Sequence, residues 1–457
     1  MQKCECVICS NRLDFQLPDS LLDEFDAGKV VVFAGAGVST ENRNVLKQTF
    51  YESIAAELGE RSSQKAFPEL MSQFCGQPNG RLQLLERILA RFQHIHSFRE
   101  LEFTATAFHR SVSTLFMLDT IITTNWDTYF EDVCGAIPFV TDSDLAFWDS
   151  PQRKVLKIHG SVQNYGSIVA TSEDYRGCES RLHTELIGSV LKTILATKTV
   201  IFVGYSLTDS DFQNVFAFVA KHMKGLNRQA YVINPFDSEC RRFAEMGLIP
   251  IQTAASYFFD SVKAHYVESG RMYSDEIYGE AADQRVLVRE EHEKLCERFS
   301  IHQFPQLIYA LAYQDGLMHG FDRVGTHAGT GEYSHPCRIR EVFSLYEAMQ
   351  KKKRAARVYE DVAYIEGYVN AFIYLGISQD KHYVNETADD ELIPHPPLYF
   401  AFGLPKEHSG RGEIGTLEEF EELVPELPGL HQASFKRAQR LADSLDEDMT
   451  FHHPPWL

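Results

Sequence analysis

The stretch VVVFAGAGVST, residues Val30 to Thr40, is an apolar run that breaks into two glycines and then two hydroxyl residues. This pattern is typical of a buried strand that ends in a tight turn before a helix. Glycines let backbone N–H groups approach an anion, and a helix N-terminus favours negative charge. The dinucleotide fingerprint G-x-G-x-x-G is incomplete because Thr40 stands at the third glycine position, and no G-K-[ST] of a P-loop follows. The turn alone predicts either a phosphate contact or a simple connection between strand and helix.

Further apolar runs predict more strands, and helical periodicity lies between several of them. A short strand and a capped helix start are also expected within 167–177, and the pattern between 41 and 118 predicts a helical insertion. Buried strands that alternate with helices predict an α/β fold with a doubly wound, mainly parallel, Rossmann-like sheet. The expected strands lie at 30–35, 120–125, 154–160, 199–206, 230–235 and 248–253.

The pattern changes near residue 256, where strand signals fade and helical stretches rich in aromatic and charged residues begin. We therefore expect an N-terminal segment that contains cysteines, an α/β domain and a mostly helical domain. Their expected bounds are 1–27, 28–255 and 256–457. A glycine-rich stretch at 324–335 fits no phosphate motif and is expected to be an irregular loop.

Polar residues follow five of the predicted strands at their carboxyl ends. In open α/β sheets, ligands bind just beyond these ends. Each residue taken singly also fits an ordinary structural role. In that interpretation Asn125 and Asn234 form turns, His159 is a core histidine with its hydrogen bonds satisfied, and Ser206 caps a helix. Glycine, hydroxyl, amide or imidazole groups at five successive strand ends together predict a ligand site instead.

Composition limits the classes of partner. The chain has 457 residues and a formal net charge of -20, which argues against broad binding to nucleic acid or anionic lipid. The run KKKRAAR at 351–357 is a local exception that is more often a solvated helix face. No apolar run approaches the roughly 18 residues that a membrane span needs, and no signal-peptide pattern is present. We expect a cytoplasmic protein without membrane contact.

Nine scattered cysteines make a disulfide framework improbable. Only Cys4, Cys6 and Cys9 are clustered, and they could supply three thiolate ligands to zinc. No second C-x-x-C lies nearby, which favours free thiols or an N-terminal hook, with zinc as the alternative.

The strand-end elements, in this order, resemble the sirtuin-like NAD-binding domain. The resemblance covers roughly residues 28 to 255, and a TSEDY segment at 171–175 is similar to one recurrent in prokaryotic members. The matching elements are GAGVS, TTNWD, KIHG, VGYSLTDSDF and VIN.

Two departures define the subtype. Sirtuin deacylases carry two C-x-x-C pairs between the His-Gly element and the next Gly-Ser strand, whereas this chain has one cysteine, Cys178, between His159 and Gly204. The G-I-P-x-F-R run of those enzymes is also missing. These departures argue against an acyl-lysine substrate. The chain is more similar to the sirtuin-like NADases of bacterial antiphage defence, in which NAD depletion halts the infected cell.

The resemblance implies an NAD glycohydrolase with NAD as substrate and with Asn125 and His159 as the catalytic pair. Asn125 would hold a water or a ribose hydroxyl, and His159 would act as a neutral base. Asp127 would brace the Asn125 loop, and Asn234 would meet the adenosine ribose. The full set of NAD-binding residues implied is Gly35, Ala36, Gly37, Ser39, Thr124, Asp127, Gly204, Tyr205, Ser206, Asp209 and Asn234.

An NADase that is always active would poison its own cell, so we expect the helical domain to gate it. A partner protein or a nucleotide signal would release the gate, and a homo-oligomer is expected. Two alternatives stay open: a non-catalytic NAD or ADP-ribose sensor in a defence complex, and an NAD-dependent deacylase or ADP-ribosyl transferase.

Overall fold

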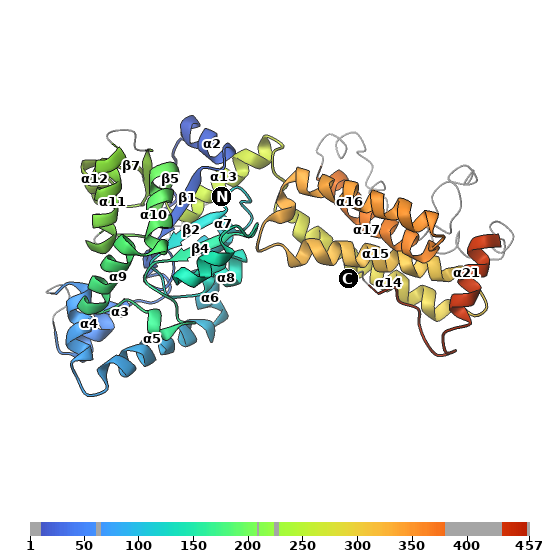
Figure 1. The fold of residues 1–457 in the computed structure, drawn as a ribbon, viewed down its shortest axis with the longest axis horizontal. Helices are drawn as coiled ribbons and strands as arrows, with labels where there is room; N and C mark the ends of the chain where they lie inside the picture. Colours follow the sequence, from blue (N-terminus) through green and yellow to red (C-terminus); the bar gives the residue numbers. More distant parts are fainter. Residues whose placement is uncertain (1–10, 61–64, 208–209, 224–227, 380–431, 455–457) are drawn as a thin grey trace, which may run out of the picture. The chain divides into compact units, whose positions relative to one another are not determined.

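The computed structural model describes residues 11–60, 65–207, 210–223, 228–379 and 432–454. The chain divides into two compact units (Figure 1). The sheet unit comprises Met1–Tyr266 with Gly329–Gly331, and the helical unit comprises Val267–Ala328 with Glu332–Leu457. The unit changes within helix α13 (Ala255–Glu268), at whose start the expected domain boundary lies. The boundary at 255/256 stays a prediction.

Seven strands form one sheet in the order β3-β4-β2-β1-β5-β6-β7, and every neighbouring pair is parallel. The strands β2 to β4 lie on one side of β1, and β5 to β7 lie on the other. The topological switch point, where such sheets bind ligands, is therefore between β1 and β5. The strands are β1 (Val30–Ala34), β2 (Thr120–Thr123), β3 (Ile137–Phe139), β4 (Lys154–Lys157), β5 (Thr199–Val203), β6 (Ala230–Ile233) and β7 (Ile249–Ile251).

The predicted doubly wound parallel sheet is confirmed. Every residue of β1 and β5 is buried, as expected for strands covered on both faces. The edge strand β3 was not predicted, because three residues with a central proline give little strand signal. The short strand expected within 167–177 is wrong. Val169 bonds to the carbonyl of His159, beyond the last residue of β4, so this segment continues past the sheet.

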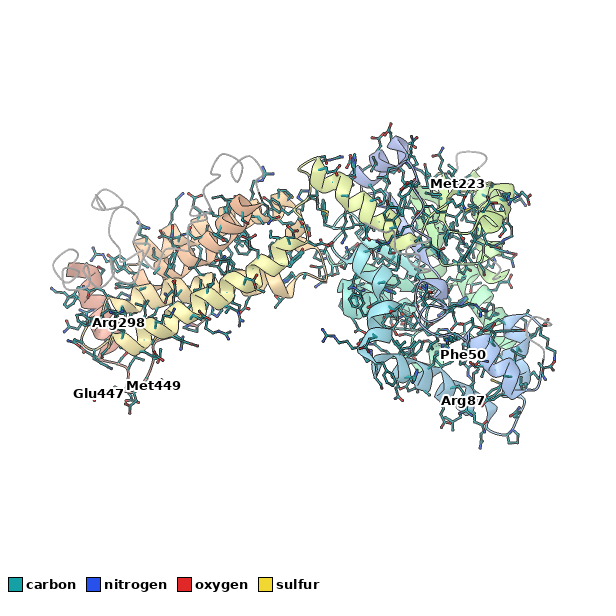
Figure 2. The ribbon with its side chains drawn as sticks, turned by 180° about the vertical axis from the view of Figure 1, so that it is seen from behind. Phe50, Arg87, Met223, Arg298, Glu447 and Met449 are labelled. Atoms are coloured by element: carbon teal, nitrogen blue, oxygen red, sulfur yellow. The ribbon has the colours of Figure 1, made fainter. Side chains whose placement is uncertain are left out.

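The helical insertion after β1 is confirmed and contains five helices. Arg87 of α5, labelled in Figure 2, pairs with Glu57 of α3 at 2.8 Å and links these two helices. Apolar side chains between these helices form a small core of their own around Leu70, Met71 and Leu84. The helices are α3 (Phe50–Glu57), α4 (Phe67–Cys75), α5 (Gly80–His96), α6 (Arg99–Ala105) and α7 (Ala107–Ser113).

The remaining helices of the sheet unit cover the sheet or connect its strands. Side chains of α9, α10 and α11 join residues of the central strands in one hydrophobic core. The helix start expected near 171 is confirmed, because Thr171 and Asp174 form a capping box at α9. These helices are α2 (Asp19–Asp26), α8 (Tyr129–Cys134), α9 (Ser172–Thr184), α10 (Leu186–Thr197), α11 (Ser210–Met223) and α12 (Asp237–Glu245).

The helical unit confirms the predicted helical C-terminal region. Its two central helices, α15 and α17, approach closely at glycines. A Cβ on Gly316 would lie 2.0 Å from the carbonyl oxygen of Tyr364, and one on Gly367 would lie 2.0 Å from that of Tyr313. The helices are α14 (Glu276–Arg298), α15 (Leu307–Thr326), α16 (Pro336–Ala355), α17 (Tyr359–Ser378) and α21 (Gln432–Ala442).

The structure assigns secondary structure to two stretches that the sequence analysis singled out. Most of the basic run 351–357 lies on the last turn of α16. The stretch 324–335 comprises the end of α15, turns and a short 3-10 helix, Glu332–Ser334. Among the described residues, no helix combines the length and the apolar composition that crossing a membrane requires.

Candidate functional site

Four strand ends of the sheet unit surround one cavity of about 310 Å³. Its floor comes from the residues that follow β1, β2, β4 and β5, and its walls come largely from the helical insertion. Nine of the sequence-predicted site residues line it: Ala36, Gly37, Thr124, Asn125, Asp127, His159, Gly204, Tyr205 and Ser206. The residues predicted at the ends of β1, β2, β4 and β5 therefore converge on one cavity that includes the switch point.

The glycines that follow β1 and β5 interlock. A Cβ on Gly35 would lie 2.5 Å from the carbonyl oxygen of Gly204, and one on Gly37 would lie 2.9 Å from the same atom. Gly204 has φ +57° and faces the backbone nitrogen of Val38. The N–H of Gly37 donates to Gly204 at 3.0 Å, and that of Gly35 donates to Val203 at 2.9 Å. In this conformation, the two glycine N–H groups hold the strand ends together.

Asn125 is held in a buried position with one polar atom unused. Its Nδ2 donates to the carbonyl of Gly35 and to Oγ of Ser39, both at 3.3 Å. Its backbone N–H donates to Oγ1 of Thr123, whose hydroxyl donates to the carbonyl of Ala34. Its Oδ1 is buried and accepts no hydrogen bond from the described residues. A buried acceptor of this kind is costly unless a ligand or water bonds to it.

Ser39 and Asp127 form the layer behind Asn125. Oγ of Ser39 donates to Oδ2 of Asp127 at 3.0 Å, and Ser39 is fully buried. The other carboxylate oxygen of Asp127 accepts from the backbone N–H of Tyr129. Burial raises the pKa of Asp127, and the charge of Lys157 opposes this shift. Ser39 thus orients the amide and the carboxylate and does not itself line the cavity.

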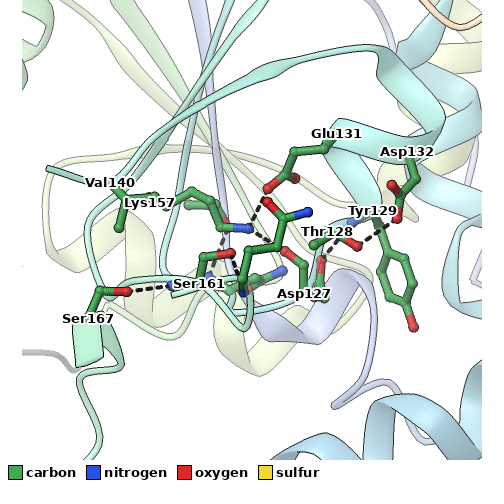
Figure 3. Close-up of polar contacts among 12 residues, drawn as sticks. Asp127, Thr128, Tyr129, Glu131, Asp132, Val140, Lys157, Ser161 and Ser167 are labelled. Carbon is green, nitrogen blue, oxygen red and sulfur yellow. Dashed lines mark hydrogen bonds and ion pairs between the residues drawn. The ribbon is translucent and has the colours of Figure 1, made fainter. Parts of the chain in front are cut away.

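A buried lysine supports the same loop (Figure 3). Nζ of Lys157, the last residue of β4, donates to the backbone carbonyl of Asp127 and pairs with Glu131 at 2.8 Å. The side chain of Lys157 is 1% exposed and that of Glu131 is 9% exposed. Burial raises the pKa of Glu131 and Lys157 opposes the shift. The pair fixes the start of α8 against the sheet and thereby fixes the Asn125–Asp127 loop.

His159 follows β4 by two residues and lies in the wall of the cavity. It is 3% exposed, and its ring meets that of Tyr175 on α9 edge-on, with centroids 5.1 Å apart. The first turn of α9 is anchored by Asp174, which pairs with Arg81 of α5 at 2.7 Å. His159 thus lines the cavity while its ring packs against this anchored helix.

Asn234 does not reach the cavity. Its Oδ1 accepts from the backbone N–H of Phe236, and its carbonyl accepts from Cys240. These contacts are those of a turn former at the end of β6. Asp209 and the N-terminal Cys4, Cys6 and Cys9 lie outside the described residues, so the contacts and the zinc predicted for them stay predictions.

Sequence reasoning missed the residues that the helical insertion and α9 supply. Glu41 lines the cavity, pairs with Arg91 at 3.1 Å and accepts from the N–H of Phe50. Burial raises the pKa of Glu41, and Arg91 opposes the shift. Trp126, which stands between two predicted residues, packs against Phe50. The aromatic lining residues missed are Phe50, Tyr51, Phe67, Phe92, Trp126 and Tyr175.

Comparison with known proteins gives the class. Residues 119–251 match the model of the SIR2-like domain. The chain therefore carries a SIR2-like domain, and the resemblance to the sirtuin-like NAD-binding family is confirmed. This segment includes β2 to β7 and, with them, Asn125 and His159.

Several curated proteins are similar to part of this chain. NAD(+) hydrolase ThsA of Enterococcus faecium is 25% identical over 228 residues, which are 46% of this chain and 44% of that protein. NAD(+) hydrolase ThsA of Cytobacillus dafuensis is 28% identical over 208 residues, 44% of this chain and 40% of that protein. Defense-associated sirtuin 2 of Bacillus subtilis is 29% identical over 160 residues, 32% of this chain and 16% of that protein. The chain thus spans less than half the length of these relatives.

Proposed function

We propose that the sheet unit is an NAD glycohydrolase that cleaves NAD to nicotinamide and ADP-ribose. The observation that carries the proposal is the unused, buried Oδ1 of Asn125 in a cavity that His159 also lines. This acceptor lies at the switch point of a parallel sheet, where nucleotides bind. Several relatives bear the name NAD(+) hydrolase, which supports the same activity.

The proposed reaction breaks the bond between the ribose anomeric carbon and the nicotinamide nitrogen. The electron pair leaves with nicotinamide, which departs neutral, so no strong general acid is needed. The transition state resembles that of glycoside hydrolysis, with positive charge on the ribose. Oδ1 of Asn125 accepts a hydrogen bond from the attacking water or from a ribose hydroxyl, and the water oxygen bonds to the anomeric carbon. His159 takes the proton that the water loses.

The other lining residues would bind and shield NAD. The turn of Gly35, Ala36 and Gly37, with Gly204, Tyr205 and Ser206, would accommodate the pyrophosphate by close backbone approach. Thr124 would contact the ribose, and Asp209 would contact NAD from the loop after β5. The aromatic wall would exclude bulk water from the reacting carbon. Ser39 and Asp127 would keep Asn125 oriented.

We further propose that the chain is a gated effector of bacterial antiphage defence that depletes NAD. The name of one relative, Defense-associated sirtuin 2, supports a defence context. The helical unit would regulate the site, a partner protein or nucleotide signal would activate it, and a homo-oligomer would assemble. The absence of sirtuin ribbon cysteines between His159 and Gly204 disfavours the deacylase alternative.

The test is release of nicotinamide from NAD by the purified full-length chain, alone and with lysate of phage-infected cells. His159→Ala and Asn125→Ala are the test variants. His183→Ala and Asn214→Ala are matched controls, because both residues are exposed and lie outside the cavity. We expect release to fall at least 100-fold in the test variants and to stay unchanged in the controls.

Binding of NAD, measured by calorimetry, separates the alternatives. NAD binding without release under either condition would refute the glycohydrolase and favour the sensor. Release at full rate without any partner would refute the gating. Equal loss in the controls would show that the variants act through folding and not through the site.

A further inference from the structure

Three metal-ligating side chains meet in the helical unit, away from the NAD cavity. His292 comes from α14, Asp315 from α15 and His452 from the segment after α21. One ligand atom of each lies within 4.8 Å of the others. We propose that these residues bind a zinc ion that fastens the C-terminal segment to α14 and α15.

Burial of unpaired groups supports the site. His292 is 4% exposed, and neither of its ring nitrogens has a hydrogen-bond partner among the described residues. Leaving polar atoms unpaired at such a position is unfavourable, and a bound ligand would offset this cost. The neutral imidazole is the form that coordinates metals, through either ring nitrogen.

The carboxylate is equally enclosed. Asp315 is 3% exposed, and it accepts hydrogen bonds from the backbone N–H of His453 and from Nδ1 of His452. Buried carboxylates are stabilised by a cation or by several donors. A divalent ion bound between the three side chains would place a positive charge next to this buried carboxylate.

The geometry requires one small movement. Nδ1 of His452 lies 3.4 Å from Oδ1 of Asp315. Two ligands of a tetrahedral zinc with bonds of about 2.0–2.1 Å are about 3.4 Å apart, so this pair already has the right separation. The rings of His292 and His452 are stacked, with centroids 4.9 Å apart and an angle of 15° between planes. Coordination by both requires His452 to turn, which its 60% exposed side chain permits.

Ligand chemistry favours zinc. Two imidazoles and one carboxylate form a ligand set common for this ion, and a water would complete the tetrahedron. The three ligands are far apart in sequence, so the ion would act as a cross-link between three segments. Figure 2 shows the C-terminal segment, with Glu447 and Met449, near the end of α14 at Arg298. The proposed ion therefore stabilises this end of the helical unit.

The experiment uses the full-length chain in which Cys4, Cys6 and Cys9 are replaced by serine, so that N-terminal thiolates cannot contribute. The metal-stripped protein is titrated with zinc in a calorimeter, and cobalt is used as a spectroscopic probe. His452→Ala is the main test variant because this side chain is 60% exposed, the most exposed of the three. His302→Ala, an exposed histidine of the same unit, is the matched control.

We expect one zinc per chain, a cobalt spectrum without thiolate charge transfer, and a higher melting temperature of the helical unit with zinc. His452→Ala should weaken zinc binding at least tenfold and remove the thermal shift, whereas His302→Ala should change neither. No saturable zinc binding in the protein with serine at positions 4, 6 and 9 would overturn the proposal. Unchanged affinity in both His452→Ala and Asp315→Asn would also overturn it.

Discussion

Replacing Lys157 with methionine should destabilise the sheet unit strongly. The side chains of Lys157 and Glu131 are 1% and 9% exposed, and their charged atoms lie 2.8 Å apart. Methionine keeps the apolar length of the lysine but leaves the Glu131 carboxylate buried without its partner. Removing one member of a buried ion pair typically costs about 3–5 kcal/mol. The carbonyl of Asp127 also loses its donor, so we expect the upper half of that range.

Two control variants separate the charge from the packing. Lys157→Met combined with Glu131→Leu removes both charges, and replacement of a buried pair by apolar groups is often neutral. The double variant should therefore recover most of the loss. Glu131→Gln in the Lys157→Met background should recover part of it, because the amide is neutral at all pH values.

Urea unfolding followed by tryptophan fluorescence provides the assay. Trp126 and Trp148 lie in the sheet unit, and Trp456→Phe removes the remaining tryptophan. In Lys157→Met, burial without the lysine should raise the pKa of Glu131 further. The folded state then binds more protons than the unfolded state above the ordinary pKa of glutamate. Stability of the variant should hence be greatest at low pH and fall as pH rises through the folded pKa. A loss below about 1 kcal/mol, or no recovery in the double variant, would refute this reasoning.

Three further outcomes are expected. Gly204→Ala should lower the free energy of unfolding by about 1–3 kcal/mol, because Gly204 has φ +57° and an added Cβ would meet the backbone nitrogen of Val38. Gly177→Ala in α9 should not lower it, because a Cβ there would enter open space. Burial lowers the pKa of His109 to about 3. The free energy of unfolding of the wild type should therefore fall from pH 6.5 toward pH 3, because the unfolded state takes up a proton that the folded state does not. In urea unfolding, the free energy of His109→Phe should depend less on pH. Arg437→Ala removes both donors from the buried Glu360, and should cost about 1–3 kcal/mol and speed proteolysis at α21; unchanged cleavage would contradict this.

The sheet and the base of the candidate site could be predicted from the sequence because both depend on local signals. Asn125, His159 and Gly37 each follow an apolar run directly, and the carboxyl ends of parallel strands meet at one edge. That these residues lie close together could be predicted without knowing where the helices pack. Two predicted residues do not line the cavity: Ser39 orients Asp127 through a tertiary contact, and Asn234 makes a local turn contact.

The aromatic wall of the cavity and the ion pair that supports the Asn125–Asp127 loop could not be predicted, because both depend on tertiary packing. Trp126 and Phe50 meet only when α3 folds against the loop after β2. Lys157 carried a weak signal, as a lysine inside the apolar run KVLKIHG, but its partner Glu131 lies 26 residues away. His292, Asp315 and His452 have no spacing that any metal motif uses. A sequence pattern cannot show such neighbours before the helices are placed.

The interlocked glycines after β1 and β5 also limit how the chain can vary. Gly35 and Gly37 contact Gly204 through backbone atoms, so a side chain at any one of the three would push the other turn aside. No second substitution can create the missing space, because backbone cannot be made smaller. Variants with altered ligand preference would have to arise from the helical wall, at Phe50, Phe67 or Phe92, while the two turns stay as a pair. A library that randomises the wall should therefore yield far more folded members than one that randomises the turns.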